Sequence, residues 1–251
     1  MVGRLALLLV VACSSKRPPR VEDAAKPVAP ASDAAAPDAA VATSGSGDVA
    51  IRVEWKNVPA AMRASPGRTP CNTPRAPLVA PTTTWGIPDA IVVVDGAPPV
   101  TAAARITLAD CALSPRVAVG DSLVVESALD RPAGLVLARR GDAGKLPALV
   151  AGDARAIQLP VAGHAVAVPL EAGAVYQLAT GDKDPELTWI VAGTAAISDA
   201  SGVASIKNLP SGAHGVTAWL PPRAGQPARQ ARGTVTVVAN GLAELTLELV
   251  P

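Results

Sequence analysis

Aromatic side chains are nearly absent from this sequence. Its 251 residues include no Phe, one Tyr and four Trp. Proteins that bind single-stranded nucleic acid stack the bases on aromatic rings, so this composition argues against such a platform. Two His, three Cys and two Met also leave few side chains for metal or nucleophile chemistry. We therefore expect no catalytic residue, no metal ligand and no cofactor.

Charge of either sign is also scarce. Charged residues make up 17% of the chain, below the roughly 25% of ordinary globular domains. The 22 Lys and Arg residues nearly balance the 21 Asp and Glu residues, for a net charge of +1. Such a chain has no net field that would draw it onto nucleic acid or an anionic surface. What the sequence does contain is aliphatic material, because 49% of its residues are hydrophobic and can fill a core.

The start of the chain has the pattern of an export signal. Residues 5–12 (LALLLVVA) form an apolar run behind Arg4, far shorter than the roughly 20 residues of a membrane-spanning helix. A short positive region followed by such a run is typical of a signal peptide, which we assign to residues 1–12. The run ends in Val10-Val11-Ala12-Cys13. This ending resembles the lipobox of bacterial lipoproteins, in which the Cys is lipidated and becomes the mature N-terminus.

The resemblance implies a lipid anchor at Cys13. Several acyl chains on one Cys hold a soluble domain at a membrane, where a single chain binds only marginally. Ser14 and Ser15 follow the Cys, with no Asp beside it. By analogy with lipoprotein sorting in enteric bacteria, this favours the outer membrane over the inner membrane. The alternative is a secretory signal that is cleaved nearby, which leaves Cys13 unmodified or removes it.

Residues 13–48 are predicted to form a disordered tether. They are rich in Pro, Ala, Ser and Asp and show no apolar period. A flexible chain of this length spans on the order of 30 Å. Lys16, Arg17 and Arg20 lie beside the proposed anchor. They are either contacts to lipid headgroups or a solvated stub.

From Val49 onward the sequence predicts strands. Residues 50–55 alternate apolar and polar side chains, and residues 90–94 (AIVVV) form a short apolar run before the turn Asp95-Gly96. Gly, Pro, Asp and Asn clusters recur about every ten residues, which indicates an all-β sandwich or barrel. One short helical turn is expected at residues 59–62. The other predicted strands are 117–119, 123–126, 135–138, 165–170, 175–178, 187–192, 203–206, 216–219, 234–238 and 242–249.

Residues 198–219 carry the clearest family resemblance. Ser198-Asp199-Ala200-Ser201-Gly202 and Asn208-Leu209-Pro210-Ser211-Gly212 precede two predicted strands. This arrangement resembles the carboxypeptidase regulatory-like repeat, a small transthyretin-like β-sandwich. In that pattern Asp-x-x-Gly closes a hairpin through a side-chain-capped turn. Ala204 and His214 stand where the family usually has Phe and Tyr, so we expect a less tightly filled core there.

Residues 117–136 together with 165–191 are similar in outline to a cupredoxin, a Greek-key β-sandwich. A type 1 copper site needs two imidazoles and a thiolate, usually with an axial Met. By counting along the chain, the family's ligand positions fall near Gly134, Thr180, Lys183 and Glu186. None of these is His, Cys or Met, and His164 and His214 lie fifty residues apart. The resemblance therefore implies a cupredoxin-like domain without copper.

A third set of segments connects the other two. Residues 52–55, 59–63, 71–72, 88–94 and 110–115 resemble secreted plastocyanin-like proteins, with Leu113 and Arg116 in place of an aromatic residue and a His. This resemblance implies a split domain. Residues 49–100 and 192–251 then form the regulatory-like sandwich, and residues 101–191 form an inserted cupredoxin-like domain. The alternative is that the two domains follow one another in sequence.

Cys71 and Cys111 are the only Cys residues in the predicted globular part of the chain. An even pair in an exported protein predicts a disulfide. Closing a loop of about forty residues stabilises the fold by roughly 4 kcal/mol in the chain-entropy description. The alternative is a pair of separately buried thiols.

The remaining candidate sites carry weaker signals. Asp182, Asp184 and Glu186 alternate on a predicted loop and could hold a hard cation, but the segment lacks the length and Gly of an EF-hand loop, and a solvated turn is the favoured explanation. Trp85 follows Thr82-Thr83-Thr84 and is either a core plug or an exposed ring on which a sugar packs. Trp219 is a second candidate ligand contact. Catalytic motifs such as G-x-S-x-G, C-x-x-C and H-E-x-x-H are absent from the sequence.

Together these observations predict a non-catalytic, lipid-anchored envelope protein that acts as a binding or scaffolding module. Its partners would be the membrane, through Cys13, and an envelope protein or glycan, with no nucleic acid. Two alternatives stay open at this point. One is a periplasmic electron-transfer or copper protein with an unassigned metal site. The other is a glycan-binding module that uses Trp85 or Trp219.

Overall fold

The computed structural model describes residues 45–79, 85–143, 153–182, 185–223 and 225–250. Within these residues the protein is all-β, as predicted, and its one helix is the short α1 (Ala60–Arg63) at the expected turn. The predicted signal peptide, Cys13, residues 13–44 of the predicted tether, and Thr82–Thr84, Lys183 and Asp184 lie outside the described residues.

The first strand begins at Ser46, inside the stretch assigned to the tether. β1 (Ser46–Glu54) includes Gly47, whose Cα lies against neighbouring backbone. A Cβ at this position would lie 2.5 Å from the Val238 carbonyl oxygen and 2.8 Å from that of Gly241. Glycine is therefore required by the close approach of two chain segments, which nothing in the local sequence reveals.

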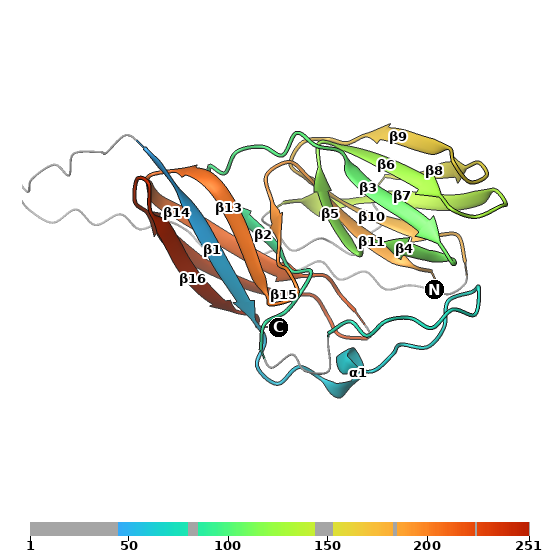
Figure 1. Cartoon of the computed structure of the whole chain (residues 1–251), viewed down its shortest axis with the longest axis horizontal. Helices are drawn as coiled ribbons and strands as arrows, with labels where there is room; N and C mark the ends of the chain where they lie inside the picture. The colour runs from blue at the N-terminus through green and yellow to red at the C-terminus, as the bar shows by residue number, and fades with distance from the viewer. Residues whose placement is uncertain (1–44, 80–84, 144–152, 183–184, 224, 251) are drawn as a thin grey trace, which may run out of the picture. The chain divides into compact units, whose positions relative to one another are not determined.

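Seven strands form the first lobe, in two sheets that draw on both ends of the described chain (Figure 1). One sheet has the order β13-β1-β16, where β1 runs antiparallel to β13 and parallel to β16. The other has the order β12-β2-β14-β15, with all its pairs antiparallel. The strands are β2 (Ile91–Val94), β12 (Ala196–Ile197), β13 (Val203–Pro210), β14 (Gly212–Leu220), β15 (Arg229–Val237) and β16 (Leu242–Glu248).

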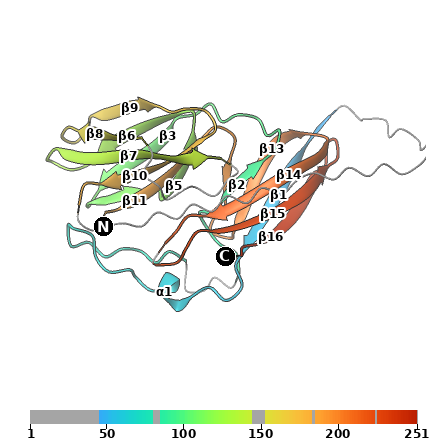
Figure 2. The same ribbon diagram turned by 180° about the vertical axis from the view of Figure 1, so that it is seen from behind.

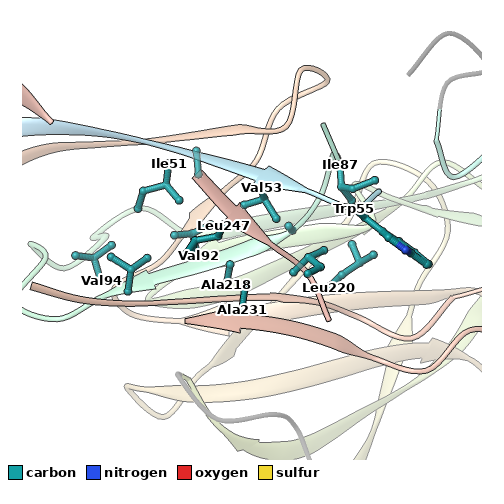
Figure 3. Packing of buried hydrophobic residues seen from close by; sticks show 14 of the residues in the cluster. Ile51, Val53, Trp55, Ile87, Val92, Val94, Ala218, Leu220, Ala231 and Leu247 are labelled. Carbon is teal, nitrogen blue, oxygen red and sulfur yellow. The ribbon is translucent and has the colours of Figure 1, made fainter. Parts of the chain in front are cut away.

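The core of this lobe is built almost entirely from aliphatic side chains. Alternate residues of β1, including Ile51 and Val53, are fully buried. Figure 3 shows them pointing toward Val92 and Ala218 of the opposite sheet, with Trp55 at the end of the cluster. Ala204 belongs to the same cluster and is fully buried.

Two turns carry the chain from one sheet of the first lobe to the other. The turn at 199–202 leads from β12 to β13, which pair with strands of different sheets, so the expected hairpin is replaced by a corner between sheets. Gly202 has a φ of 85° there, and Asn208 before the next corner has a φ of 58°. His214 does not fill the core, because its Nδ1 lies 2.7 Å from the Asp95 carbonyl oxygen and its Nε2 lies 2.7 Å from that of Pro210.

Nine strands from residues 104–192 form the second lobe. Its sheets have the orders β5-β11-β10-β7-β8 and β4-β3-β6-β9, with β5 parallel to β11 and β3 parallel to β6. Tyr176 is the single aromatic ring in its core cluster, and its hydroxyl accepts a hydrogen bond from the Glu171 N–H at 3.0 Å. The strands are β3 (Ala104–Ala109), β4 (Ala112–Ser114), β5 (Val117–Gly120), β6 (Ser122–Ser127), β7 (Ala133–Asp142), β8 (Ala154–Leu159), β9 (Ala165–Pro169), β10 (Ala174–Thr180) and β11 (Leu187–Ala192).

Four strands of the two lobes, namely β3, β4, β8 and β12, were not predicted. β4 and β12 span only three and two residues, too few to show a period. β8 buries only Ile157 and Leu159. β3 does alternate buried and exposed positions, but two of its apolar residues are Ala, whose small side chain gives a weak strand signal.

A third apolar cluster combines side chains from both lobes. Ile91 and Trp219 of the first lobe pack with Trp189, Val175, Val117 and Val191 of the second. The rings of Trp189 and Trp219 meet edge to face, with centroids 5.7 Å apart and planes at 85°. An aromatic pair of this geometry adds about 0.5–1.5 kcal/mol to the burial of its area.

The segment between β1 and β2 also reaches both lobes. Val58, Met62 and Val79 belong to the first lobe's core. Cys71 forms a disulfide with Cys111 at the turn between β3 and β4, with the two Cα atoms 5.5 Å apart, which confirms the predicted pairing. The segment includes α1, which is labelled in the two opposite views of Figures 1 and 2.

Candidate functional site

A cleft of about 680 Å³ lies among the described residues. Its walls come from the segment after α1, the β3–β4 turn with the residues that follow it, and the start of β11. Asp89, Pro222 and Arg223 complete the lining. This volume lies within the range of roughly 300–1,000 Å³ that is usual for small-molecule sites.

The Cys71–Cys111 disulfide holds one wall of the cleft in place. Beside it, the Thr69 hydroxyl donates to the Asp110 carbonyl oxygen at 3.0 Å. Asp110 and Cys111 have φ values of 49° and 59°, so the β3–β4 turn uses the left-handed region twice in succession. The covalent link and the hydrogen bond together fix this turn against the segment after α1.

A second wall contains an ion pair between Arg75 and Glu186. Both side chains are only 17% exposed, so the pair is screened less than a surface pair. The Glu186 N–H donates to the Thr180 hydroxyl at 3.0 Å, and the Gly181 N–H donates to the Gly134 carbonyl oxygen at 3.2 Å. Thus the positions compared with cupredoxin ligands at 134, 180 and 186 do meet at one end of the second lobe. The Thr180 hydroxyl is bonded by Glu186, the Gly134 carbonyl oxygen is bonded by Gly181, and the Glu186 carboxylate is paired with Arg75.

The back of the cleft holds two Arg side chains around one carboxylate. Arg223 Nη1 lies 3.2 Å from Asp89 Oδ2, and Arg116 Nη1 lies 4.0 Å from the same oxygen. Arg223 Nη2 also donates to the Asp89 carbonyl oxygen at 3.4 Å. Arg116 Nη2 donates to the carbonyl oxygens of Ala76 and Pro77 at 3.0 and 3.3 Å. Asp89 itself has a φ of 60°, a conformation that non-glycine residues seldom adopt.

Burial determines the electrostatics of this group. The Arg223 side chain is 8% exposed, against 33% for Arg116 and 28% for Asp89. Burial lowers the pKa of Arg223, Asp89 raises it again, and the neighbouring Arg116 lowers it further. A guanidinium stays charged in proteins in spite of such a shift. The back of the cleft therefore keeps two cations beside a single anion.

The rest of the lining is mainly apolar. Leu78, Leu113 and Trp189 contribute large side chains, and Leu113 and Trp189 are themselves almost completely buried. Four Pro residues stiffen the surrounding loops because each has a fixed φ. They are Pro66, Pro74, Pro185 and Pro222.

The candidate ligand contacts from the sequence lie elsewhere. Trp85 is 52% exposed and does not line the cleft. Trp219 is fully buried in the cluster shared by the two lobes, so its ring offers no face to a ligand. Asp182 is exposed, and Glu186 is engaged by Arg75. No group of three or more His, Cys, Asp or Glu side chains suited to a metal ion occurs in the part of the chain that the structure describes.

Sequence analysis did not identify Asp89, Arg75 or Arg223 as site residues. Arg116 was noted only because it stands where a related family has His. Asp89 and Arg223 are 134 residues apart in the chain. Asp89 lies in the segment 88–94 that was compared with plastocyanin-like proteins, but that comparison does not involve Arg223, so no sequence signal placed the two together.

The fold and the cleft define an all-β protein with an arginine-lined pocket. Comparison with protein-family models, curated proteins and solved structures found no match for the chain. Among the described residues, no helix has the length and apolarity needed to cross a membrane.

Proposed function

We propose that this protein is a non-catalytic, lipid-anchored protein of a bacterial cell envelope that binds a partner or ligand. The cleft of about 680 Å³ is the observation that carries the proposal. It combines apolar walls with a few polar groups at fixed positions, which is the usual composition of a binding site. The anchor is proposed from the lipobox-like ending at Cys13.

The strand pairing supports the proposed split of the chain between two lobes. Residues 46–94 and 196–248 share the sheets of the first lobe, while residues 104–192 build the second. This pairing favours a split regulatory-like sandwich with a cupredoxin-like domain inserted into it. A sequential arrangement of two domains would not need strands from both ends of the chain in one sheet.

The contacts of Thr180 and Glu186, two of the positions compared with cupredoxin ligands, support a second lobe without copper. Thr180 and Glu186 are occupied by hydrogen bonds and an ion pair within the protein. Metal analysis and a visible spectrum of the purified protein test this part. Stoichiometric copper with a charge-transfer band would overturn it and favour the electron-transfer alternative.

Binding in the cleft can be tested by blocking it. Ala76 lines the cleft and is exposed, so Ala76→Trp should fill the opening without disturbing a core. Ala61, an exposed residue of α1 outside the cleft lining, provides the matched control Ala61→Trp.

The experiment captures crosslinked material from the native envelope with the lipidated full chain. We expect the wild type and Ala61→Trp to retain the same molecules and Ala76→Trp to lose them. Equal capture by all three proteins would contradict binding in the cleft. A Cys13→Ser chain should leave the detergent phase in a phase-partition assay, and its retention there would contradict the anchor.

Trp85 supports a second candidate function, glycan binding. Its ring is 52% exposed, and an exposed indole is a common platform for a sugar ring. This alternative predicts that cell-wall or capsular sugars quench the Trp fluorescence of the wild type. The quenching should be absent in Trp85→Ala, and a signal that persists in that variant would rule the site out.

A further inference from the structure

We infer that the cleft recognises a ligand with a single carboxylate on an apolar body, and that Arg116 and Arg223 hold the carboxylate. This inference rests on the proposed binding function and names the chemical class of the ligand. It follows from the charges of Arg116, Arg223 and Asp89, from the N–H groups of the two Arg side chains and from the apolar residues that also line the cleft.

Two positive charges surround the single negative charge of Asp89. Asp89 Oδ2 is the shared contact of two guanidinium groups, at 3.2 Å from Arg223 and 4.0 Å from Arg116. Glu186 is engaged by Arg75, and Asp110 is exposed. Arg223 is buried and paired with Asp89, whereas Arg116 is 33% exposed and lies farther from that carboxylate, so this group has one positive charge more than Asp89 compensates. One more anion beside Arg116 and Arg223 would balance this group.

Hydrogen bonds within the protein hold Arg116 and Arg223 in position. A guanidinium carries five N–H donors in a planar fork that matches a carboxylate. Arg223 uses Nη1 on one carboxylate oxygen of Asp89 and Nη2 on the Asp89 backbone carbonyl oxygen. Arg116 uses Nη2 on the carbonyl oxygens of Ala76 and Pro77. Both side chains are anchored by these bonds and both line the cleft. They are positioned before a ligand arrives, which reduces the entropy lost on binding.

The charges that line the cleft favour a carboxylate over a phosphate as the bound anion. Asp89, Asp110 and Glu186 all line the same cleft as the Arg pair. Arg75 lines it too, so the three Arg and three acidic side chains balance over the whole lining, and the excess of one positive charge is local to Arg116, Arg223 and Asp89. A single negative charge matches this local excess, whereas a doubly charged phosphate exceeds it. Leu78, which is partly exposed, and Leu187, which is 39% exposed, then provide the surface for an apolar body.

Isothermal titration of the full chain with three probes tests the inference. The probes are hydrocinnamate, its uncharged counterpart hydrocinnamyl alcohol, and inorganic phosphate. We expect hydrocinnamate to bind at least about tenfold more tightly than the alcohol, because a hydrogen bond to a charged group contributes more than a neutral one. We expect phosphate to bind more weakly than hydrocinnamate.

Variants identify the residues. Arg116→Gln and Arg223→Gln should each weaken hydrocinnamate binding about tenfold or more and leave the weak binding of the alcohol unchanged. Arg105→Gln, an exposed Arg of β3 outside the cleft, is the matched control and should bind like the wild type. Because Arg223 is buried, its variant is checked for folding by circular dichroism. If it is unfolded, Arg116→Gln alone decides.

The outcomes distinguish this inference from the proposed function. Equal affinity for acid and alcohol, unchanged binding in Arg116→Gln, tighter binding of phosphate, or no binding of hydrocinnamate by the wild type would each overturn the inference. None of these would affect a binding function shown by loss of envelope capture in Ala76→Trp. Unchanged capture in that variant would contradict the proposed function itself.

Discussion

At the scale of single residues, Asp199 organises the turn that takes the chain from one sheet of the first lobe to the other. Its Oδ1 accepts hydrogen bonds from the Ser201 N–H at 2.8 Å, the Ser201 hydroxyl at 2.6 Å and the Val203 N–H at 3.0 Å. The Ser201 hydroxyl and then the Val203 N–H are the main reasons why the pKa of Asp199 lies below its ordinary value. The sequence indicated this side-chain cap, because Asp with Gly three residues later is a local turn signal.

We predict that Asp199→Ala lowers the free energy of unfolding by about 1 kcal/mol near neutral pH, since Asp199 is exposed and solvent screens the interaction. A lowered pKa in the folded state means that the contribution is complete above the unfolded-state pKa, about 3.9, and is lost as pH falls through the folded-state pKa. Denaturant unfolding at several pH values measures the difference between wild type and variant. Asp199→Asn keeps an acceptor without the titrating group. A difference for Asp199→Ala that stays constant down to about pH 2 would contradict this reading.

At the scale of elements, the described part of the segment between β1 and β2 has little regular structure besides α1 and is held by its contacts with both lobes. Met62 and Val79 pack in the first lobe, and Cys71 is bonded to Cys111 in the second. A segment with so few backbone pairs depends on such links, because its chain entropy is otherwise offset by little burial. This is the element that forms one wall of the cleft.

We predict that replacing both Cys71 and Cys111 by Ser lowers the free energy of unfolding by up to about 4 kcal/mol, the chain-entropy value for a loop of 40 residues. Denaturant unfolding with and without reductant provides the measurement. Reductant should destabilise the wild type and leave the double variant unchanged. Equal stability of wild type and variant under oxidising conditions would show that the packing of Met62 and Val79 is sufficient to hold the segment.

At the scale of the whole molecule, the cluster shared by the two lobes contains two of the four Trp residues of the chain. Trp219 is fully buried, and its Nε1 has no hydrogen-bond partner among the described residues. The indole therefore contributes apolar area and an edge-to-face contact, at the cost of an unsatisfied N–H group. In a protein without Phe, this pair is the largest aromatic contact that we find in the described residues.

We predict that Trp219→Ala lowers the free energy of unfolding by about 3–5 kcal/mol, the usual loss for a buried Trp. Trp219→Phe should cost less, because it keeps a ring and removes the unsatisfied N–H. Trp85→Ala, at a residue that is 52% exposed, is the control and should change stability by less than about 0.5 kcal/mol. Differential scanning calorimetry measures all three. Similar losses in Trp219→Ala and Trp85→Ala would contradict the role assigned to the cluster.

The sequence by itself determined those features that depend on neighbouring residues. Alternation along residues 50–55 and the apolar run at 90–94 predicted β1 and β2, and the turn chemistry predicted the cap at Asp199, because each of these patterns is local. The disulfide was also predictable, since Cys71 and Cys111 are the only Cys residues in the predicted globular part of the chain. Very short strands such as β12 escaped because two residues show no period.

Only the tertiary structure decided how distant segments meet. Pairing of β1 with both β13 and β16, the close approach that requires glycine at position 47, and the burial of Trp219 all depend on partners far along the chain. The cleft is the clearest case, since Asp89 and Arg223 are separated by 134 residues. Side-chain type indicates what a residue can do chemically, but two guanidinium groups meet at one carboxylate only when the folded chain brings these distant residues together.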